Sequence, residues 1–146
     1  MKQKNAIAMI LISLMSLFFL SACHQKRTPI ISADKLDKAV ILIKDDQGRE
    51  RTWEASDLSF LKALLGNLNL VFGKDDKSAQ DFDTPLTAKE KAFTYQITFY
   101  QADKIVQTIH VSLTKDITVD RKQFTVKGTD RQALDSLIQH LLVVAK

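Results

Sequence analysis

Nucleophilic catalysis would need a serine, threonine or cysteine beside a base, and this chain repeats one such spacing. Ser-x-x-Lys occurs at Ser32/Lys35, Ser59/Lys62 and Ser112/Lys115. The spacing begins acylation in penicillin-binding enzymes, where further motifs accompany it. Here the three copies fall in three different contexts, and the sequence has no G-x-S-x-G, Walker, H-E-x-x-H or C-x-x-C motif. We therefore predict no serine acylase.

Histidines and carboxylates can bind metal ions, but their spacing here does not favour a metal site. The histidines after residue 23 are His24, His110 and His140, which fall in a polar segment, a strand pattern and a helix pattern. Four aspartates between Asp75 and Asp83 lack the D-x-D-x-D-G order and the final glutamate of a calcium loop. We predict a solvated acidic loop, no metal site and no cofactor.

The only cysteine, Cys23, follows a hydrophobic leader. Lys2 and Lys4 precede an uncharged run from Ala6 to Leu20. A positive start, an apolar core and small residues at the end are the parts of a secretory signal. As a helix this core would span about 22 Å, which is short of the roughly 30 Å apolar thickness of a bilayer. The pattern predicts a cleaved signal over residues 1–22; an uncleaved anchor and a signal cut elsewhere are the alternatives.

Leu20-Ser21-Ala22-Cys23 resembles the lipobox of bacterial lipoproteins. The resemblance implies cleavage between Ala22 and Cys23 and lipidation of the Cys23 thiol, which would then carry a diacylglycerol. Lipidation also removes a reactive thiol that has no disulfide partner within the chain. Several acyl chains give the stable membrane attachment that one chain does not. We expect an outward-facing protein at the membrane of the cell envelope; an outer-membrane address stays open if the source is Gram-negative.

The chain after the signal has the length of one domain. Removing residues 1–22 leaves 124 of 146 residues, and 19 basic residues (21 minus Lys2 and Lys4) face 17 acidic ones. Acids and bases are interspersed, so no basic stripe predicts nucleic-acid binding. We divide the chain into a signal (1–22), a lipidated polar tether (23–38) and a single globular domain (39–146).

The first half of the domain has the pattern of a hairpin followed by a helix. Residues 39–44 are rich in Val and Ile, residues 45–48 have turn composition, and residues 51–54 fit the returning strand. A helix capped by Ser56 or Asp57 should follow. Its predicted buried stripe is Leu58, Leu61, Leu65 and Leu68. Residues 73–91 form a long polar connection of a length that is uncommon in compact domains.

The second half alternates with a period of two and then ends in a helical pattern. Residues 93–100 and 105–113 alternate apolar and polar side chains, and residues 117–119 and 124–126 flank a predicted turn at Asp120–Gln123. Thr129 and Gln132 fit the capping box of a last amphipathic helix. The predicted fold class is therefore α+β: an antiparallel sheet, made of the hairpin and a β-meander, with two helices covering one face.

One parity of the meander predicts a polar sheet face. Its candidate binding residues are Gln96, Thr98, Tyr100, Thr108 and His110; Thr94, Val106, Ser112 and Thr125 share that parity, whereas Ile105 falls on the apolar side. One-sided antiparallel sheets normally have a solvated face, which is the plain interpretation. The functional interpretation is a recognition surface in which Tyr100 would be the anchor, because tyrosine buries apolar area and keeps a polar tip.

The runs 99–111 and 117–126 resemble small lipoproteins of Gram-positive bacteria with uncharacterised globular domains, and the resemblance transfers no catalytic residue. We predict a lipid-anchored binding or interaction module for a protein or envelope ligand. The alternatives are a small envelope hydrolase with an unrecognised site, and an inhibitor or immunity protein against a secreted enzyme. A concave pocket with perturbed titratable groups would favour the enzyme. An exposed patch with aromatic anchors would favour the binding module or the inhibitor.

Overall fold

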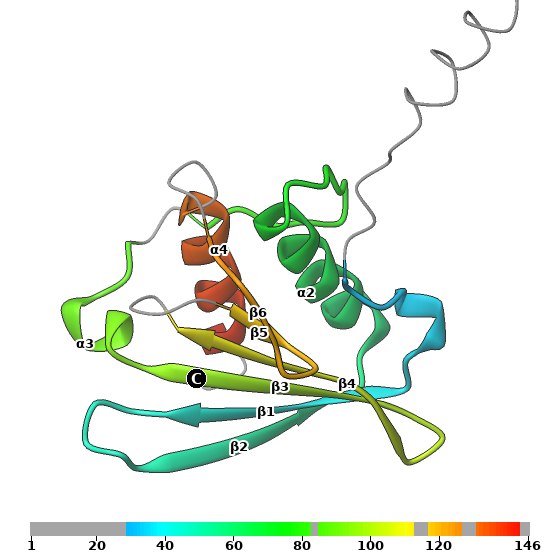
Figure 1. The fold of residues 1–146 in the computed structure, drawn as a ribbon, viewed down its shortest axis with the longest axis horizontal. Helices are drawn as coiled ribbons and strands as arrows, with labels where there is room; N and C mark the ends of the chain where they lie inside the picture. Colours follow the sequence, from blue (N-terminus) through cyan, green and yellow to red (C-terminus); the bar gives the residue numbers. More distant parts are fainter. Residues whose placement is uncertain (1–28, 83–84, 113–116, 127–130, 144–146) are drawn as a thin grey trace, which may run out of the picture.

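A six-stranded antiparallel sheet with the order β2-β1-β3-β4-β5-β6 organises the computed structural model of the chain (Figure 1). The structure describes residues 29–82, 85–112, 117–126 and 131–143. The strands are β1 (Lys38–Lys44), β2 (Glu50–Ala55), β3 (Thr94–Gln101), β4 (Lys104–Ser112), β5 (Ile117–Val119) and β6 (Lys122–Phe124). The helices are η1 (Ala33–Lys35), α2 (Leu58–Val71), α3 (Ala88–Lys91) and α4 (Arg131–Val143). The predicted signal over residues 1–22, Cys23, Asp83 and Thr129 lie outside the described residues.

The longer helices, α2 and α4, pack against each other and cover one face of the sheet, which confirms the predicted α+β fold (Figure 1). Asp57 caps α2 by accepting the Phe60 N–H at 2.8 Å. The buried side chains of the two helices include Leu61, Leu64, Leu65, Leu68, Leu134, Leu137, Ile138 and Leu141. Leu58 was wrongly predicted to be buried. It is 51% exposed because it is the first residue of α2 and lies outside the packed stripe.

The predicted hairpin is present, and its first strand joins it to the meander. Asp45 Oδ1 accepts the N–H groups of Gln47 and Arg49, both at 2.9 Å, and Gly48 has a φ of 80° that favours glycine. β1 pairs with β2 on one side and with β3 on the other. The hairpin therefore extends the same sheet rather than forming a separate layer.

The register between β3 and β4 shifts beside Phe99 and Tyr100. Gln107 lies opposite Phe99, Ile105 lies opposite Tyr100, and Val106 is the extra residue between them. Val106 consequently packs against the core, while Ile105 is 61% exposed. The sequence predicted the reverse for these two residues. That prediction was wrong because it carried strict alternation through the bulge.

The β5–β6 turn is tighter than predicted. Asp120 and Arg121 have φ values of 47° and 71°, which is the geometry of a two-residue hairpin turn with both central residues left-handed. β6 consequently begins at Lys122 and ends at Phe124, two residues earlier than the strand predicted at 124–126. The Phe124 ring meets the Phe72 ring edge-on, with centroids 5.2 Å apart. This contact ties the hairpin to the C-terminal end of α2.

The long polar connection is partly built into the fold. Its second half contains α3, which starts with a capping box between Thr87 and Glu90. Its first half is bonded to α2: Asn67 Oδ1 accepts the Gln80 N–H at 2.7 Å, and Asn69 Nδ2 donates to Asp76 Oδ2 at 2.8 Å. Asp76, one of the predicted acidic-loop residues, therefore stabilises the loop itself.

Residues 29–38, which the sequence predicted to be part of a polar tether over residues 23–38, pack against the domain. Gln107 holds the chain at two points, because its Oε1 accepts the Ile31 N–H at 3.0 Å and its Nε2 donates to the Pro29 carbonyl at 2.6 Å. Leu36 is buried in the core, and the Asp37 N–H donates to the Tyr100 carbonyl at 2.9 Å. Residues 29–38 thus belong to the folded domain. The sequence prediction missed this because these scattered apolar residues have no helical or strand period.

Candidate functional site

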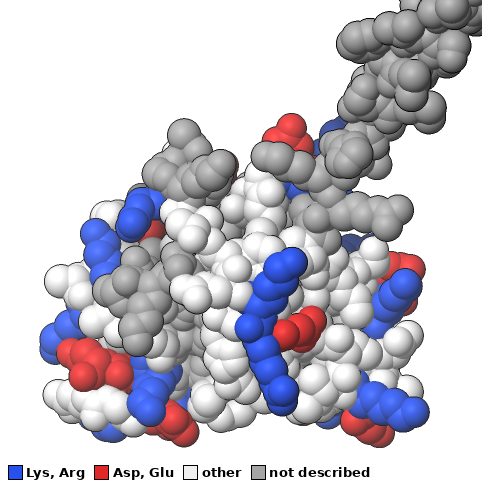
Figure 2. Space-filling model, viewed as in Figure 1, with Lys and Arg blue, Asp and Glu red and all other residues white. Residues whose placement is uncertain are grey.

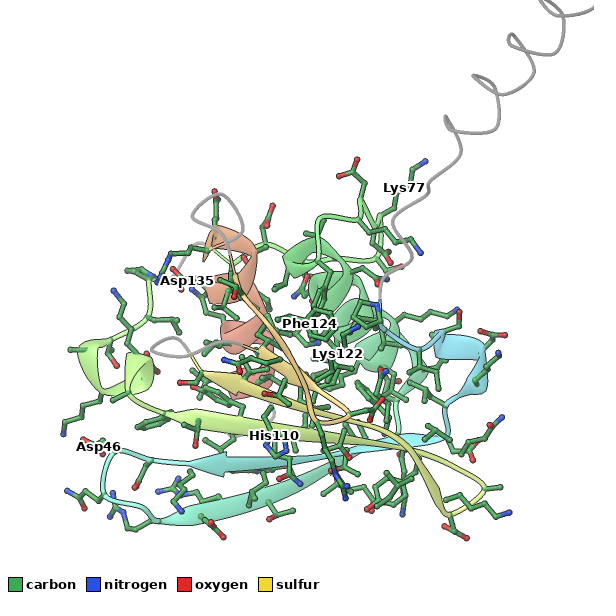
Figure 3. All side chains as sticks on the ribbon, viewed as in Figure 1. Asp46, Lys77, His110, Lys122, Phe124 and Asp135 are labelled. Carbon is green, nitrogen blue, oxygen red and sulfur yellow. The ribbon has the colours of Figure 1, made fainter. Side chains whose placement is uncertain are left out.

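The predicted polar face lies on the side of the sheet away from the helices. The register pairs Gln96 with His110 and Thr98 with Thr108, while Tyr100 faces Lys38 of β1. Alternate residues of the same strands, such as Ile97 and Ile109, point into the core under the helices. All five candidate residues therefore share one face, and Figure 3 shows His110 on that side of the sheet.

The five candidate residues differ in solvent exposure, and therefore in how accessible each is to a ligand. His110 is exposed, and Gln96 and Thr108 are half-buried. Thr98 is only 6% exposed, and Gln96 Nε2 donates to its Oγ1 at 3.3 Å. The Tyr100 ring lies under the Lys38 ammonium group, 5.5 Å from the ring centroid. His110 is thus the most accessible member, while Thr98 and Tyr100 are engaged within the chain.

Two hollows meet at His110 and Thr118, which are paired across β4 and β5. The first has a volume of about 330 Å³ and extends over Thr94, Gln96 and Ser112 toward β1. The second has a volume of about 400 Å³ and extends over Thr108 to the Asp120-Arg121 turn. Together they form a groove that runs across the strands. Tyr100 lines neither hollow, so the structure does not bring the predicted anchor to the groove.

Asp120 fixes the end of the groove, a role that the sequence did not reveal. Its Oδ1 accepts the Thr108 N–H at 2.9 Å, its own N–H donates to the Thr108 carbonyl at 2.9 Å, and Gln107 Nε2 lies 3.4 Å from its Oδ2. Thr118, which lines both hollows, was also missed. The alternation of residues 117–119 places Thr118 on the face opposite Ile117 and Val119, but nothing in the sequence indicated that β5 would pair with β4 at His110.

The groove suits hydrogen bonding to a polar ligand more than catalysis. Its lining combines hydroxyl, amide and imidazole groups with the apolar side chains of Leu42 and Val111, and a Lys44–Glu50 ion pair of 3.4 Å lies on the wall near β1. His110 makes no hydrogen bond to another described side chain, and the described residues contain no cluster of three or more metal-binding side chains. On the face seen in Figure 2, basic and acidic residues are interspersed without a broad patch of one sign.

A second histidine, His140 of α4, is buried between the aromatic rings of Phe60 and Phe82. It is 3% exposed, its ring stacks on Phe60 at 4.5 Å, and Phe82 meets it edge-on at 5.8 Å. Nε2 lies 3.4 Å from the Phe60 carbonyl, and Nδ1 has no hydrogen-bond partner among the described residues. Burial lowers the pKa of His140 below its ordinary 6.5, although the contact with the Phe60 carbonyl acts in the opposite direction.

The folded protein should lose stability as the pH falls through the histidine range. Because burial keeps His140 neutral in the folded state, the unfolded state binds more protons than the folded state below about pH 6.5. The free energy of unfolding therefore decreases as the pH is lowered through this range. We expect urea midpoints to decrease from pH 7.5 to pH 5 in the wild type. The His140→Phe variant should show a flatter pH profile than the wild type. Parallel profiles for wild type and His140→Phe would contradict this account.

Compared with known protein families, with curated proteins and with solved structures, the chain matches none. In the described part of the chain, each helix is too short or too polar to cross a bilayer.

Proposed function

We propose that this chain is a lipid-anchored protein of the bacterial cell envelope whose open sheet face binds a protein or another envelope component. The observation that carries the binding proposal is the groove through His110 and Thr118. Rigid antiparallel strands position its donors and acceptors, so a ligand would not have to order them on binding. The anchoring proposal rests on Leu20-Ser21-Ala22-Cys23 in the sequence.

The groove explains why the binding module is favoured over the envelope hydrolase. An enzyme would need a nucleophile or base oriented by a hydrogen-bonded neighbour. Two carboxylates line the groove: Asp120 accepts hydrogen bonds from Thr108 and Gln107, and Glu50 is paired with Lys44. Among the described residues, neither forms a hydrogen bond or an ion pair with His110. The remaining lining groups are suited to recognising polar atoms of a ligand.

The anchoring proposal is tested by replacing Cys23 in the full chain. Cells grown with an alkyne-bearing fatty acid should label the wild-type protein and retain it in the membrane fraction. Cys23→Ala should abolish lipid labelling and release the protein or change its processing, because no thiol remains to be acylated. The His110→Ala variant is the matched control and should label normally. Lipid labelling of Cys23→Ala at the wild-type level would refute the anchor.

The binding proposal is tested at His110. A photo-crosslinking amino acid at position 110 should capture a partner in cells, while the same group at Lys62, which is exposed on α2, should not. With that partner purified, His110→Ala should weaken binding by more than about 1 kcal/mol, roughly fivefold, and leave the melting temperature nearly unchanged. We expect a smaller effect from Tyr100→Ala. Equal capture at both positions, or wild-type affinity of His110→Ala, would count against the groove.

A further inference from the structure

Residues 76–82, in the first half of the long connection, form a strap that crosses α2. The Gln80 N–H holds the strap to the helix by donating to Asn67 Oδ1 at 2.7 Å. Phe82 is the only large apolar side chain of the strap, and Lys77 projects into solvent (Figure 3). The strap therefore buries little apolar area, which is typical of a segment that opens before the rest of a fold.

Two buried side-chain atoms in the described part of the chain lack a hydrogen-bond partner, and both belong to residues that contact the strap. They are Asn67 Nδ2 and His140 Nδ1. Asn67 bonds the strap through its other amide atom, and the Phe82 ring meets the His140 ring edge-on at 5.8 Å between centroids. A buried polar atom without a partner costs free energy that hydration recovers. Water reaching these two atoms would therefore offset part of the contacts that an opening strap loses.

The His140 ring contacts α2 through Phe60 and the strap through Phe82. Its Nε2 lies 3.4 Å from the Phe60 carbonyl oxygen, so we assign the proton of the neutral ring to Nε2 and leave Nδ1 as the unpartnered acceptor. Protonation would add a second N–H, at Nδ1, that has no acceptor among the described residues. A hollow of about 240 Å³ borders the ring, and Gln80 and Phe82 of the strap line it. Water that solvates an imidazolium would enter there once the strap moves.

Among the described residues, no charged side chain stabilises an imidazolium at position 140. Burial, the larger influence, lowers the pKa of His140, and the Phe60 carbonyl acts in the opposite direction. The ionisable residues closest in sequence to these contacts, on α2, the strap and α4, are Asp57, Lys62, Asp81 and Asp135. None of them contributes to the shift of that pKa. The charged ring must therefore be solvated by water.

We propose that acid opens the strap: protonation of His140 releases Phe82 and detaches residues 76–82 from α2, while the sheet and the two long helices stay folded. Phe82 moves rather than Phe60, because Phe60 belongs to α2 and its carbonyl can still accept a hydrogen bond from the protonated ring. Opening exposes the rings of Phe82 and His140 to water. This device goes beyond the proposed binding function and requires neither the lipid anchor nor the groove at His110.

Hydrogen exchange of the Gln80 N–H measures the opening, because this group is bonded to Asn67 only while the strap is closed. With a pKa of 6.5 in the open state and a neutral ring in the closed state, opening should become about tenfold more favourable between pH 7.5 and pH 5.5. The protection factor of Gln80, corrected for the intrinsic pH dependence of exchange, should fall by that factor in the full chain. It should also stay at least about a hundredfold below that of Ile97 in β3, which reports global unfolding.

Two variants separate the role of the imidazole from that of the strap. His140→Phe keeps a ring but cannot be protonated, so its Gln80 protection factor should change less than about twofold over the same pH range. Phe82→Ala should lower that factor already at pH 7.5 and raise the pKa of His140, measured by NMR, toward 6.5, because water reaches the ring. Phe93→Ala is the matched control: it removes another half-buried phenylalanine and should leave the pKa of His140 unchanged.

The wild type and Phe82→Ala test the proposal even if His140→Phe does not fold. A Gln80 protection factor that stays constant between pH 7.5 and pH 5.5 would overturn it. Equal protection factors for Gln80 and Ile97 would overturn it as well, because the strap would then open only with the whole domain. An unchanged His140 pKa in Phe82→Ala, or a wild-type pH response in His140→Phe, would show that the imidazole does not control the strap.

Discussion

Leu61→Ala should reduce the free energy of unfolding by about 2–5 kcal/mol. Leu61 is 1% exposed and lies in the stripe of α2 that packs in the core with Leu64, Leu65 and Leu68. Truncation removes buried methyl and methylene groups and leaves a space that the neighbouring side chains fill only partly. Urea denaturation of the domain followed by circular dichroism would measure the loss.

Leu58→Ala is the matched control for that substitution. It makes the same chemical change on the same helix at a residue that is 51% exposed, so we expect a loss below about 1 kcal/mol. A loss of less than about 1 kcal/mol in Leu61→Ala itself would be inconsistent with the packing of α2 in the core.

Gly66→Ala should destabilise the domain by about 1–3 kcal/mol, although alanine normally strengthens a helix relative to glycine. The loop after α2 crosses the helix at this residue. A Cβ atom on Gly66 would overlap the backbone nitrogen of Ala79 and lie 2.7 Å from the carbonyl carbon of Ser78. Backbone atoms cannot rotate away as a side chain can, so the loop must move.

The displacement of this loop can be followed separately from global stability. The Gln80 N–H donates to Asn67 Oδ1 in the folded protein, so its hydrogen exchange should accelerate in Gly66→Ala. An increase in stability by about 1 kcal/mol, as helix propensity alone predicts, would show that the loop does not rest on Gly66.

The parts of the fold that follow a period were predictable from the sequence. The alternation in β3 and the leucine spacing in α2 each report which side of an element is buried. The bulge at Val106 was not predictable. The turn after β5 was predicted at Asp120–Gln123, but its two-residue form was not, because it lacks the glycine that usually marks such geometry. The contact of the loop with Gly66 and Asn67 was likewise not predictable, because the loop sequence has no period.

The candidate site was less predictable than the fold, because it depends on which strands pair with each other. The sequence placed His110 on the correct face, since parity alone determines that. It gave no sign that Thr118 would lie beside His110, because alternation within a strand does not report which strands pair or in which register. Tyr100 could not be recognised as the partner of Lys38 for the same reason.

If Cys23 is lipidated as proposed, the hydrogen bonds of Gln107 to Pro29 and Ile31 limit how far the domain can lie from the membrane. From Cys23 to Pro29 the chain advances six residues, which span at most about 20 Å when fully extended. Pro29, where the folded domain begins, would then lie within about 20 Å of the lipid head groups. Such a short linker would restrict its binding partners to molecules that lie at or close to the membrane surface.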